Sequence, residues 1–243
     1  RLFRRSAFTA AVPANLLAVF ALVGFLFFVA QHLQLVLGHS PMQAGLILLP
    51  GLIVTIVAGL AVVPLVRVVP PRVVVAGGLL ISAAGYTAIL FTANDPSAFG
   101  LGAAFVLLSL GIGAAETISN DVIVSSVPAD KAGAASAISE TAYELGAVLG
   151  TAVLGGILSA VYSARVVVPA GLDAAAATSA SETLGGATTV AATLPEPAAT
   201  ELLDSARHAF DGGVVLTSGI AVVLVLAAAA LVWVTLRGKG AES

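Results

Sequence analysis

The chain has 243 residues, of which 59% are hydrophobic and only 9% are charged, and its mean hydropathy is +1.08. A water-soluble domain of this size needs more surface charge, and a disordered or collagen-like chain would lack the long apolar runs present here. The net charge of −3, without any basic run, disfavours nucleic acid as a partner, and the lack of cysteine excludes disulfides and thiolate metal sites.

Six apolar stretches are long enough to cross a bilayer as helices, which takes roughly 20 residues each. Helices satisfy all their backbone hydrogen bonds within the segment, as the lipid interior requires. In chain order the predicted spans are 8–29, 44–66, 73–92, 99–127, 132–162 and 214–236. We therefore predict an all-α integral membrane fold with six transmembrane helices and the lipid bilayer as its first partner.

The spans divide the chain into three parts. Residues 1–162 contain the first five helices, and residues 212–243 contain the last helix and a tail. Residues 163–211 form a longer connection that contains five acids between Asp173 and Asp204 and the run Leu194-Pro195-Glu196-Pro197. Its composition predicts a solvated extracytoplasmic loop with a short surface helix near 198–210, which we interpret as a spacer rather than a lid.

The basic residues are distributed unevenly between the two ends of the predicted helices. Only Arg165 and Arg207 fall at one end. Cytoplasmic ends of membrane helices carry an excess of Lys and Arg, so both ends of the chain are predicted to be cytoplasmic. The membrane that we predict for the chain is the plasma membrane. The other eight basic residues are Arg1, Arg4, Arg5, Arg67, Arg72, Lys131, Arg237 and Lys239.

Four acids lie inside predicted spans, where a charged side chain is costly and usually has a function or a partner. Glu116 and Asp121 are in the fourth span, and Glu140 and Glu144 are one turn apart in the fifth. If the fifth helix begins with Asp130 as its N-cap, Glu140 lies about 15 Å along it and Glu144 about 21 Å, which brackets the membrane midplane.

Carboxyl groups at that depth can bind a proton from one side and release it to the other, or attract a cationic substrate. We predict Glu140 as the first candidate for this role, Glu144 as its partner, and Glu116 and Asp121 as weaker candidates. Tyr143 is predicted to support the site by a hydrogen bond or by stacking on a cation. The alternative is that these acids only bond neighbouring helices, or for Asp121 that it interacts with Lys131 or a loop.

Small residues follow the two acids of the fifth span. Gly146, Gly150 and Gly155 have the spacing that permits close helix approach, so we predict a packing role for them. His32, His39 and His208 fall at outer edges and are predicted to be solvated rather than metal ligands. No nucleophile motif, phosphate loop or metal-ligand spacing appears, so we predict neither an enzyme nor a cofactor or metal site.

Several runs of the sequence resemble one transporter family. These are Leu2-Phe-Arg-Arg-Ser-Ala-Phe8, His32-Leu-Gln-Leu-Val-Leu-Gly-His-Ser-Pro-Met-Gln-Ala-Gly45, Leu48-Leu-Pro-Gly51, Val127-Pro-Ala-Asp-Lys-Ala-Gly-Ala-Ala-Ser-Ala137 and Glu140-Thr-Ala-Tyr-Glu-Leu-Gly146. They are similar to the ninth, tenth and thirteenth helices of the fourteen-span drug/proton antiporters of the major facilitator superfamily. Exporters of quaternary ammonium compounds have a similar acid-rich run followed by a long outer loop.

The resemblance implies that the chain is the carboxy-terminal half of a proton-coupled multidrug exporter, lacking the first eight spans. It implies alternating access against an amino-terminal half, with protons and a small amphipathic, often cationic substrate as partners. It also implies that Glu140 and Glu144 occupy the positions of membrane-embedded acids linked to proton coupling or cation recognition.

Other readings of the residues stay open at this point. A superfamily carrier for another metabolite or lipid would keep the fold and need different cavity chemistry. A channel is less favoured because no charged ring or filter-like loop appears. A membrane enzyme or a non-transporting subunit is least favoured, because the sequence has neither a reactive cluster nor a large soluble domain.

Overall fold

The computed structural model of the chain describes residues 6–92 and 97–236, apart from the side chains of residues 6, 7 and 92. Over these residues every regular element is helical. Six helical runs are long and apolar enough to cross a membrane, which confirms the predicted fold class. They are Phe8–Val36, Pro41–Leu65, Pro71–Phe91, Ala98–Ser125, Ala129–Arg165 and Ala198–Thr235.

Two of the runs contain more than one element, because short stretches of π- or 3₁₀-helix interrupt or extend them. The elements are α1 (Ser6–Gln31), the π-helical η2 (His32–Val36), α2 (Pro41–Leu65), α3 (Pro71–Thr92), α4 (Ala98–Ser125), the 3₁₀-helical η3 (Ala129–Lys131), α5 (Ala132–Leu149), the π-helical η4 (Gly150–Leu154), α6 (Gly155–Arg165), α7 (Ala174–Glu182), α8 (Leu184–Ala191) and α9 (Ala198–Thr235).

Local sequence explains where some of these helices begin. Ser40 and Gln43 form a reciprocal capping box at α2, and Pro41 occupies its first turn. The side chain of Ser97 caps α4 by accepting from the amide of Gly100 at 3.0 Å. The prediction that Asp130 caps the fifth span is wrong: Asp130 lies within η3, and α5 begins after it without a side-chain cap.

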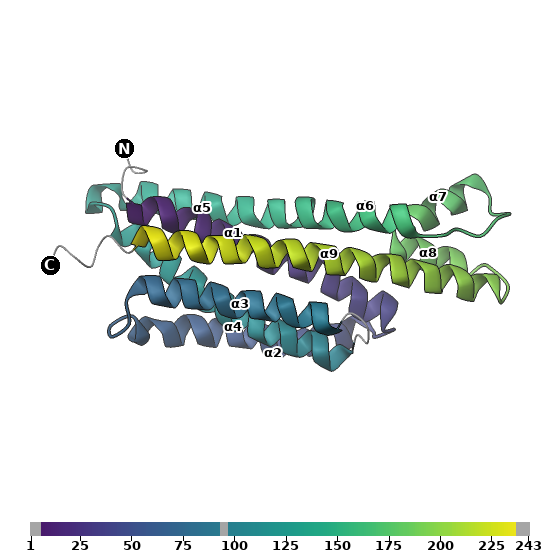
Figure 1. Cartoon of the computed structure of the whole chain (residues 1–243), viewed down its shortest axis with the longest axis horizontal. Coiled ribbons are helices and arrows are strands. Elements are labelled where there is room, and N and C mark those ends of the chain that lie inside the picture. The colour runs from purple at the N-terminus through teal and green to yellow at the C-terminus, as the bar shows by residue number, and fades with distance from the viewer. Residues whose placement is uncertain (1–5, 93–96, 237–243) are drawn as a thin grey trace.

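The spanning helices run antiparallel to their chain neighbours, and α1 lies inside the bundle against α4, α5 and α9 (Figure 1). Its core is aromatic. The rings of Phe25 and Phe105 stack with centroids 5.1 Å apart, and Tyr86 packs edge-on against Phe25 at 5.9 Å. The hydroxyl of Tyr86 donates to the carbonyl of Ala21, which satisfies a buried polar group and ties α3 to α1.

Glycines bring α5 and η4 close to α1. A Cβ atom added at Gly146 would lie 2.5 Å from the carbonyl oxygen of Leu16, and one at Gly150 would lie 2.6 Å from that of Phe20. A Cβ at Gly155 would meet the ring of Phe27 at 2.9 Å. The three predicted packing glycines therefore all face α1, two of them at backbone contact.

The segment 163–211 differs from the loop that the sequence predicts. Its first part contains two short helices, α7 and α8, and the surface helix expected at 198–210 is the first part of α9, which continues unbroken to Thr235. Gly212 and Gly213 do not end the helix, because they make room for Arg165 and Leu158 of α6. With 38 residues α9 is about 57 Å long, so its first part extends beyond a bilayer core together with α6 (Figure 1).

Candidate functional site

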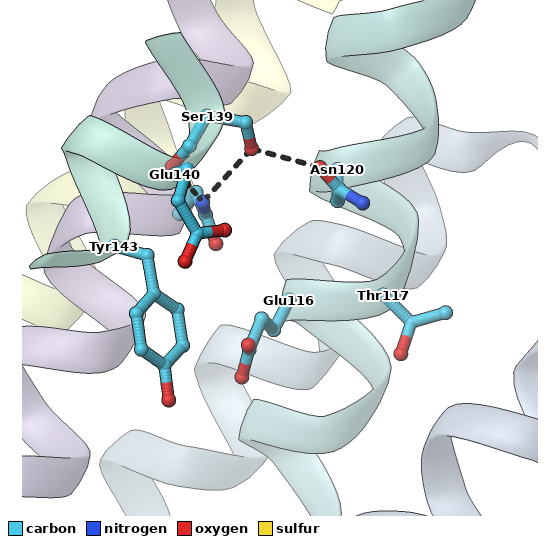
Figure 2. Close-up of a pocket in the computed structure, with 7 residues that line it drawn as sticks. Glu116, Thr117, Asn120, Ser139, Glu140 and Tyr143 are labelled. Carbon is cyan, nitrogen blue, oxygen red and sulfur yellow. Dashed lines mark hydrogen bonds between the residues drawn. The ribbon is translucent and has the colours of Figure 1, made fainter. Parts of the chain in front are cut away.

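A polar cavity of about 540 Å³ opens between α1, α4 and α5. Figure 2 shows the side chains of Glu116, Glu140 and Tyr143 extending into one space between α4 and α5. Two carboxyl groups, two amides, two alcohols and a phenol meet there in a bundle that is otherwise strongly apolar. The lining residues are Asn15, Glu116, Thr117, Asn120, Ser139, Glu140 and Tyr143.

A chain of hydrogen bonds connects the three helices beside the cavity. The Nδ2 atom of Asn15 lies 3.3 Å from Ser139 Oγ and 3.4 Å from Ser139 O. Ser139 Oγ in turn donates to Asn120 Oδ1 at 2.8 Å (Figure 2). Asn15 from α1 and Asn120 from α4 are thus both held by one hydroxyl of α5, and this fixes the walls of the cavity.

The two carboxyl groups lie at matching depths. Glu116 is about 14 Å from the end of α4, and Glu140 is about 16 Å from the start of η3, measured by the helical rise from the same end of the bundle. Half the thickness of a bilayer core is about 15 Å. Glu116 is half-buried and Glu140 is exposed on the open side of the cavity, so that one acid is deeper in the wall and the other is more accessible.

The other predicted acids do not line this cavity. Glu144 is exposed one turn farther along α5, and Asp121 is exposed about 6 Å from the end of α4. The structure therefore brings Glu140 together with Glu116 and Tyr143 rather than with Glu144. Sharing one face of a helix does not place two residues in one cavity, because the cavity is bounded by a second helix.

Four polar lining residues, Asn15, Thr117, Asn120 and Ser139, were not singled out from the sequence. The amides of Asn15 and Asn120 were detectable, because uncharged amides inside apolar spans are subject to the same cost argument as acids. Thr117 and Ser139 carried no such signal. Their hydroxyls can bond their own helix, as Thr117 does by donating to the carbonyl of Gly113 at 2.8 Å.

The prediction that the three histidines are solvated is wrong for His32. Its side chain is only 3% exposed, and its Nδ1 lies 3.3 Å from Asp211 Oδ1 on α9. His208 is exposed, with Nδ1 2.8 Å from the carbonyl oxygen of Asp204. Among the described residues no three His, Cys, Asp or Glu side chains form a group that could bind a metal ion.

Comparison with known proteins places this architecture in a family. The chain is 52% identical over 236 residues to the multidrug efflux pump LfrA of Mycolicibacterium smegmatis, covering 97% of this chain and 47% of that protein. It is 37% identical over 232 residues to the methyl viologen resistance protein SmvA of Salmonella typhimurium, covering 93% and 46%. It is 33% identical over 252 residues to the tetracenomycin C resistance and export protein of Streptomyces glaucescens, covering 99% and 46%.

The chain thus spans about half the length of these relatives. Residues 1–151, which contain the first four spanning helices and most of the fifth together with the whole polar cavity, match the Major Facilitator Superfamily. By this match, and by its six spanning helices, the chain belongs to the Major Facilitator Superfamily.

Proposed function

We propose that the chain is the carboxy-terminal half of a proton-coupled exporter that moves amphipathic, cationic compounds across the plasma membrane by alternating access. The observation that carries the proposal is the cavity at mid-depth, which contains Glu116 and Glu140 and no basic residue. The names of three relatives, a multidrug efflux pump, a methyl viologen resistance protein and a tetracenomycin C resistance and export protein, support the same activity.

The charge of the cavity favours cations over anions. With both carboxyl groups ionised the lining carries two negative charges, and no Lys or Arg contributes to it. The phenol ring of Tyr143 beside them offers a face on which a flat cation can stack. An apolar body attached to that cation would contact the surrounding helices, which are lined by Ala, Val, Leu and Ile.

Proton coupling requires that proton and substrate compete for the same group. We assign this competition to Glu140, which is accessible from the open side of the cavity, and assign Glu116 as the second acid in the wall. A protonated carboxyl group loses its attraction for the cation, so proton binding releases substrate and substrate binding releases the proton. Glu144 and Asp121, which lie outside the lining, are assigned no direct part in this exchange.

Alternating access needs a partner bundle and a fixed orientation. The cavity opens on the exposed side of α5, where an amino-terminal half would close it in the family's two-bundle arrangement. Arg67, Arg72 and Lys131 lie at the end of the bundle where α1 starts and α9 ends, which supports a cytoplasmic location of that end (Figure 1). Arg1, Arg4, Arg5, Arg237 and Lys239, which also contributed to the predicted orientation, lie outside the described residues.

The test uses the full-length protein in proteoliposomes, with efflux of a lipophilic cationic dye followed under an imposed pH gradient. We expect Glu140→Gln to abolish gradient-driven efflux and to weaken dye binding, because the neutral amide copies the protonated acid: it neither exchanges a proton nor attracts the cation. Glu116→Gln is expected to weaken both dye binding and coupling. The matched control is Glu182→Gln, an exposed acid at the end of α7 outside the cavity, which should transport like wild type.

Two results would contradict the proposal. If the wild-type protein does not respond to the pH gradient, the exporter is not proton-coupled. If Glu140→Gln transports as well as Glu182→Gln, then Glu140 is not the coupling acid, and Glu144→Gln would be the next variant to measure.

A further inference from the structure

A second pair of titratable side chains lies far from the cavity, at the other end of α1. His32 begins η2, the π-helical turn in which the first span ends, and Asp211 lies on α9. His32 Nδ1 and Asp211 Oδ1 are 3.3 Å apart, which is the one acid–base contact within 4 Å that the described residues show. The pair is about 25 Å along the helix from Asn15 of the cavity, so it is not part of that site.

The surroundings of the pair are mostly closed to water. The His32 side chain is 3% exposed and Asp211 is 27% exposed. The ring of Phe210 covers the imidazole with its centroid 6.1 Å away. The two ring nitrogens of His32 and the Oδ1 atom of Asp211 have no well-oriented hydrogen bond. The two side chains therefore stabilise each other through the electrostatic attraction between them. Water can reach the pair through Asp211.

The charged groups near the pair are few and all lie on its Asp211 side. Arg207 and His208 precede Asp211 by one turn on α9, and Arg165 of α6 lies against Gly212. On the other side, η2 itself, α1, α2 and α8 contain no further acidic or basic side chain in their described residues. His39 follows η2, with its backbone amide bonded to the carbonyl of Leu33 at 2.9 Å. No second acid can therefore replace Asp211 opposite the imidazole.

We propose that His32 and Asp211 form a proton-binding site that fastens the end of α1 to α9 while Asp211 is ionised. In that state the pair holds one proton, and an imidazolium faces a carboxylate 3.3 Å away. When a further proton neutralises Asp211, an imidazolium is left buried without a counter-charge, which is strongly unfavourable. The end of α1 then separates from α9. This inference does not depend on whether Glu140 couples protons to transport.

The site can be tested by hydrogen exchange of the full-length protein at pH 7.5 and pH 4.5, corrected for the intrinsic effect of pH on exchange. The amides to follow are those of Leu37 and His39, which bond the carbonyls of His32 and Leu33 at 3.0 and 2.9 Å. In the wild type we expect the protection of these amides to fall by about tenfold or more at the lower pH, because a buried charge that loses its counter-charge is strongly destabilising.

Variants separate this site from a general effect of acid. Asp211→Asn copies the protonated acid, so these amides should be less protected than in the wild type already at pH 7.5. His32→Gln, which cannot become charged, should abolish the change between pH 7.5 and pH 4.5. Asp204→Asn, an exposed acid two turns earlier on α9, is the matched control and should behave like wild type. Amides of α3 and α4 report whether each variant is folded.

Should Asp211→Asn fail to fold, the exchanged pair His32→Asp with Asp211→His is the second variant, and it should recover the pH response of the wild type. The proposal is overturned if protection at Leu37 and His39 in the wild type does not change with pH. It is equally overturned if Asp204→Asn lowers the protection at pH 7.5 as Asp211→Asn does.

Discussion

Ser139 is the residue at which the polar contacts of the cavity converge. Its hydroxyl is 2.8 Å from Asn120 Oδ1 and 3.3 Å from Asn15 Nδ2, so a single oxygen joins α4, α5 and α1. The side chain is buried, as is that of Asn15, whose Oδ1 already has no hydrogen-bond partner. Losing the hydroxyl would leave Oδ1 of Asn120 without its present partner, and would leave Nδ2 of the buried Asn15 with only the carbonyl oxygen of residue 139 at 3.4 Å.

We therefore expect Ser139→Ala to lower the free energy of unfolding of the full-length protein by about 1 kcal/mol, the usual cost of one internal hydrogen bond in a membrane bundle. Substrate affinity should fall as well, because Asn15 and Asn120 are then free to rotate. Unfolding by SDS titration in mixed micelles measures the first effect, and dye binding measures the second. Ser136→Ala, three residues earlier on the exposed face of α5, is the control and should change neither. Equal losses in both variants would contradict the bridging role.

At the scale of residues, the sequence identifies the acids inside the spans more reliably than it identifies which of them lie next to each other. The cost of charge in lipid selects Glu116, Asp121, Glu140 and Glu144, and two of these four line the cavity. Glu140 and Glu144 share a helix face by their spacing, yet the neighbour of Glu140 is Glu116 of α4. That pairing depends on how α4 and α5 are rotated relative to each other, and this rotation cannot be predicted from the spacing of residues along one helix.

At the scale of elements, the contact between α1 and the α5–η4 run brings the two helix backbones close together at glycines. Gly146 and Gly150 place their Cα atoms against the carbonyls of Leu16 and Phe20. These glycines permit the close approach, and on either side of them the side chain of Leu154 packs against Gly24 and Asn15 bonds Ser139. The π-helical turn η4 begins at Gly150, one of these contact glycines, and α6 continues the helix beyond it.

Gly146→Ala should disturb this contact, because its Cβ would lie 2.5 Å from a backbone oxygen that cannot rotate away. We expect a loss of about 1–3 kcal/mol in the free energy of unfolding, as for other overpacked sites, and a loss of transport with it. Gly133→Ala, on the same helix with no atom within 4 Å of the added Cβ, is the matched control and should be neutral or slightly stabilising. The measurements are SDS titration and dye efflux of the full-length protein. Equal behaviour of the two variants would show that α5 does not need its close approach to α1.

Hydropathy predicts the spanning helices to within a few residues, as the predicted 99–127 and the observed Ala98–Ser125 illustrate. It fails where a helix continues beyond the membrane. At Gly212 and Gly213 the drop in hydropathy and the glycine pair suggest a boundary, yet α9 passes through because Arg165 and Leu158 of α6 pack into the space the glycines leave. Hydropathy also does not predict the burial of His32, because its partner Asp211 lies far away in the sequence.

For the whole molecule, the two ends of the bundle differ in construction. One end has the short turns after α2 and α4, with Arg67 and Lys131, and there Arg72 lies over the ring of Trp233 at 5.8 Å. The other end has the long connection through α7 and α8 (Figure 1). An excess of basic residues marks cytoplasmic ends, so the end with α7 and α8 is expected to face outward.

The orientation can be measured directly because the chain contains no cysteine. In the full-length protein, with any cysteines outside this chain replaced, we introduce Lys131→Cys or Glu182→Cys, both at exposed positions at opposite ends of the bundle. A membrane-impermeant maleimide added to intact cells should label the cysteine at position 182 and not the one at position 131. After permeabilisation both should react, which controls for accessibility within the fold. Labelling of position 131 alone in intact cells would reverse the orientation, and with it the side from which protons reach His32 and Asp211.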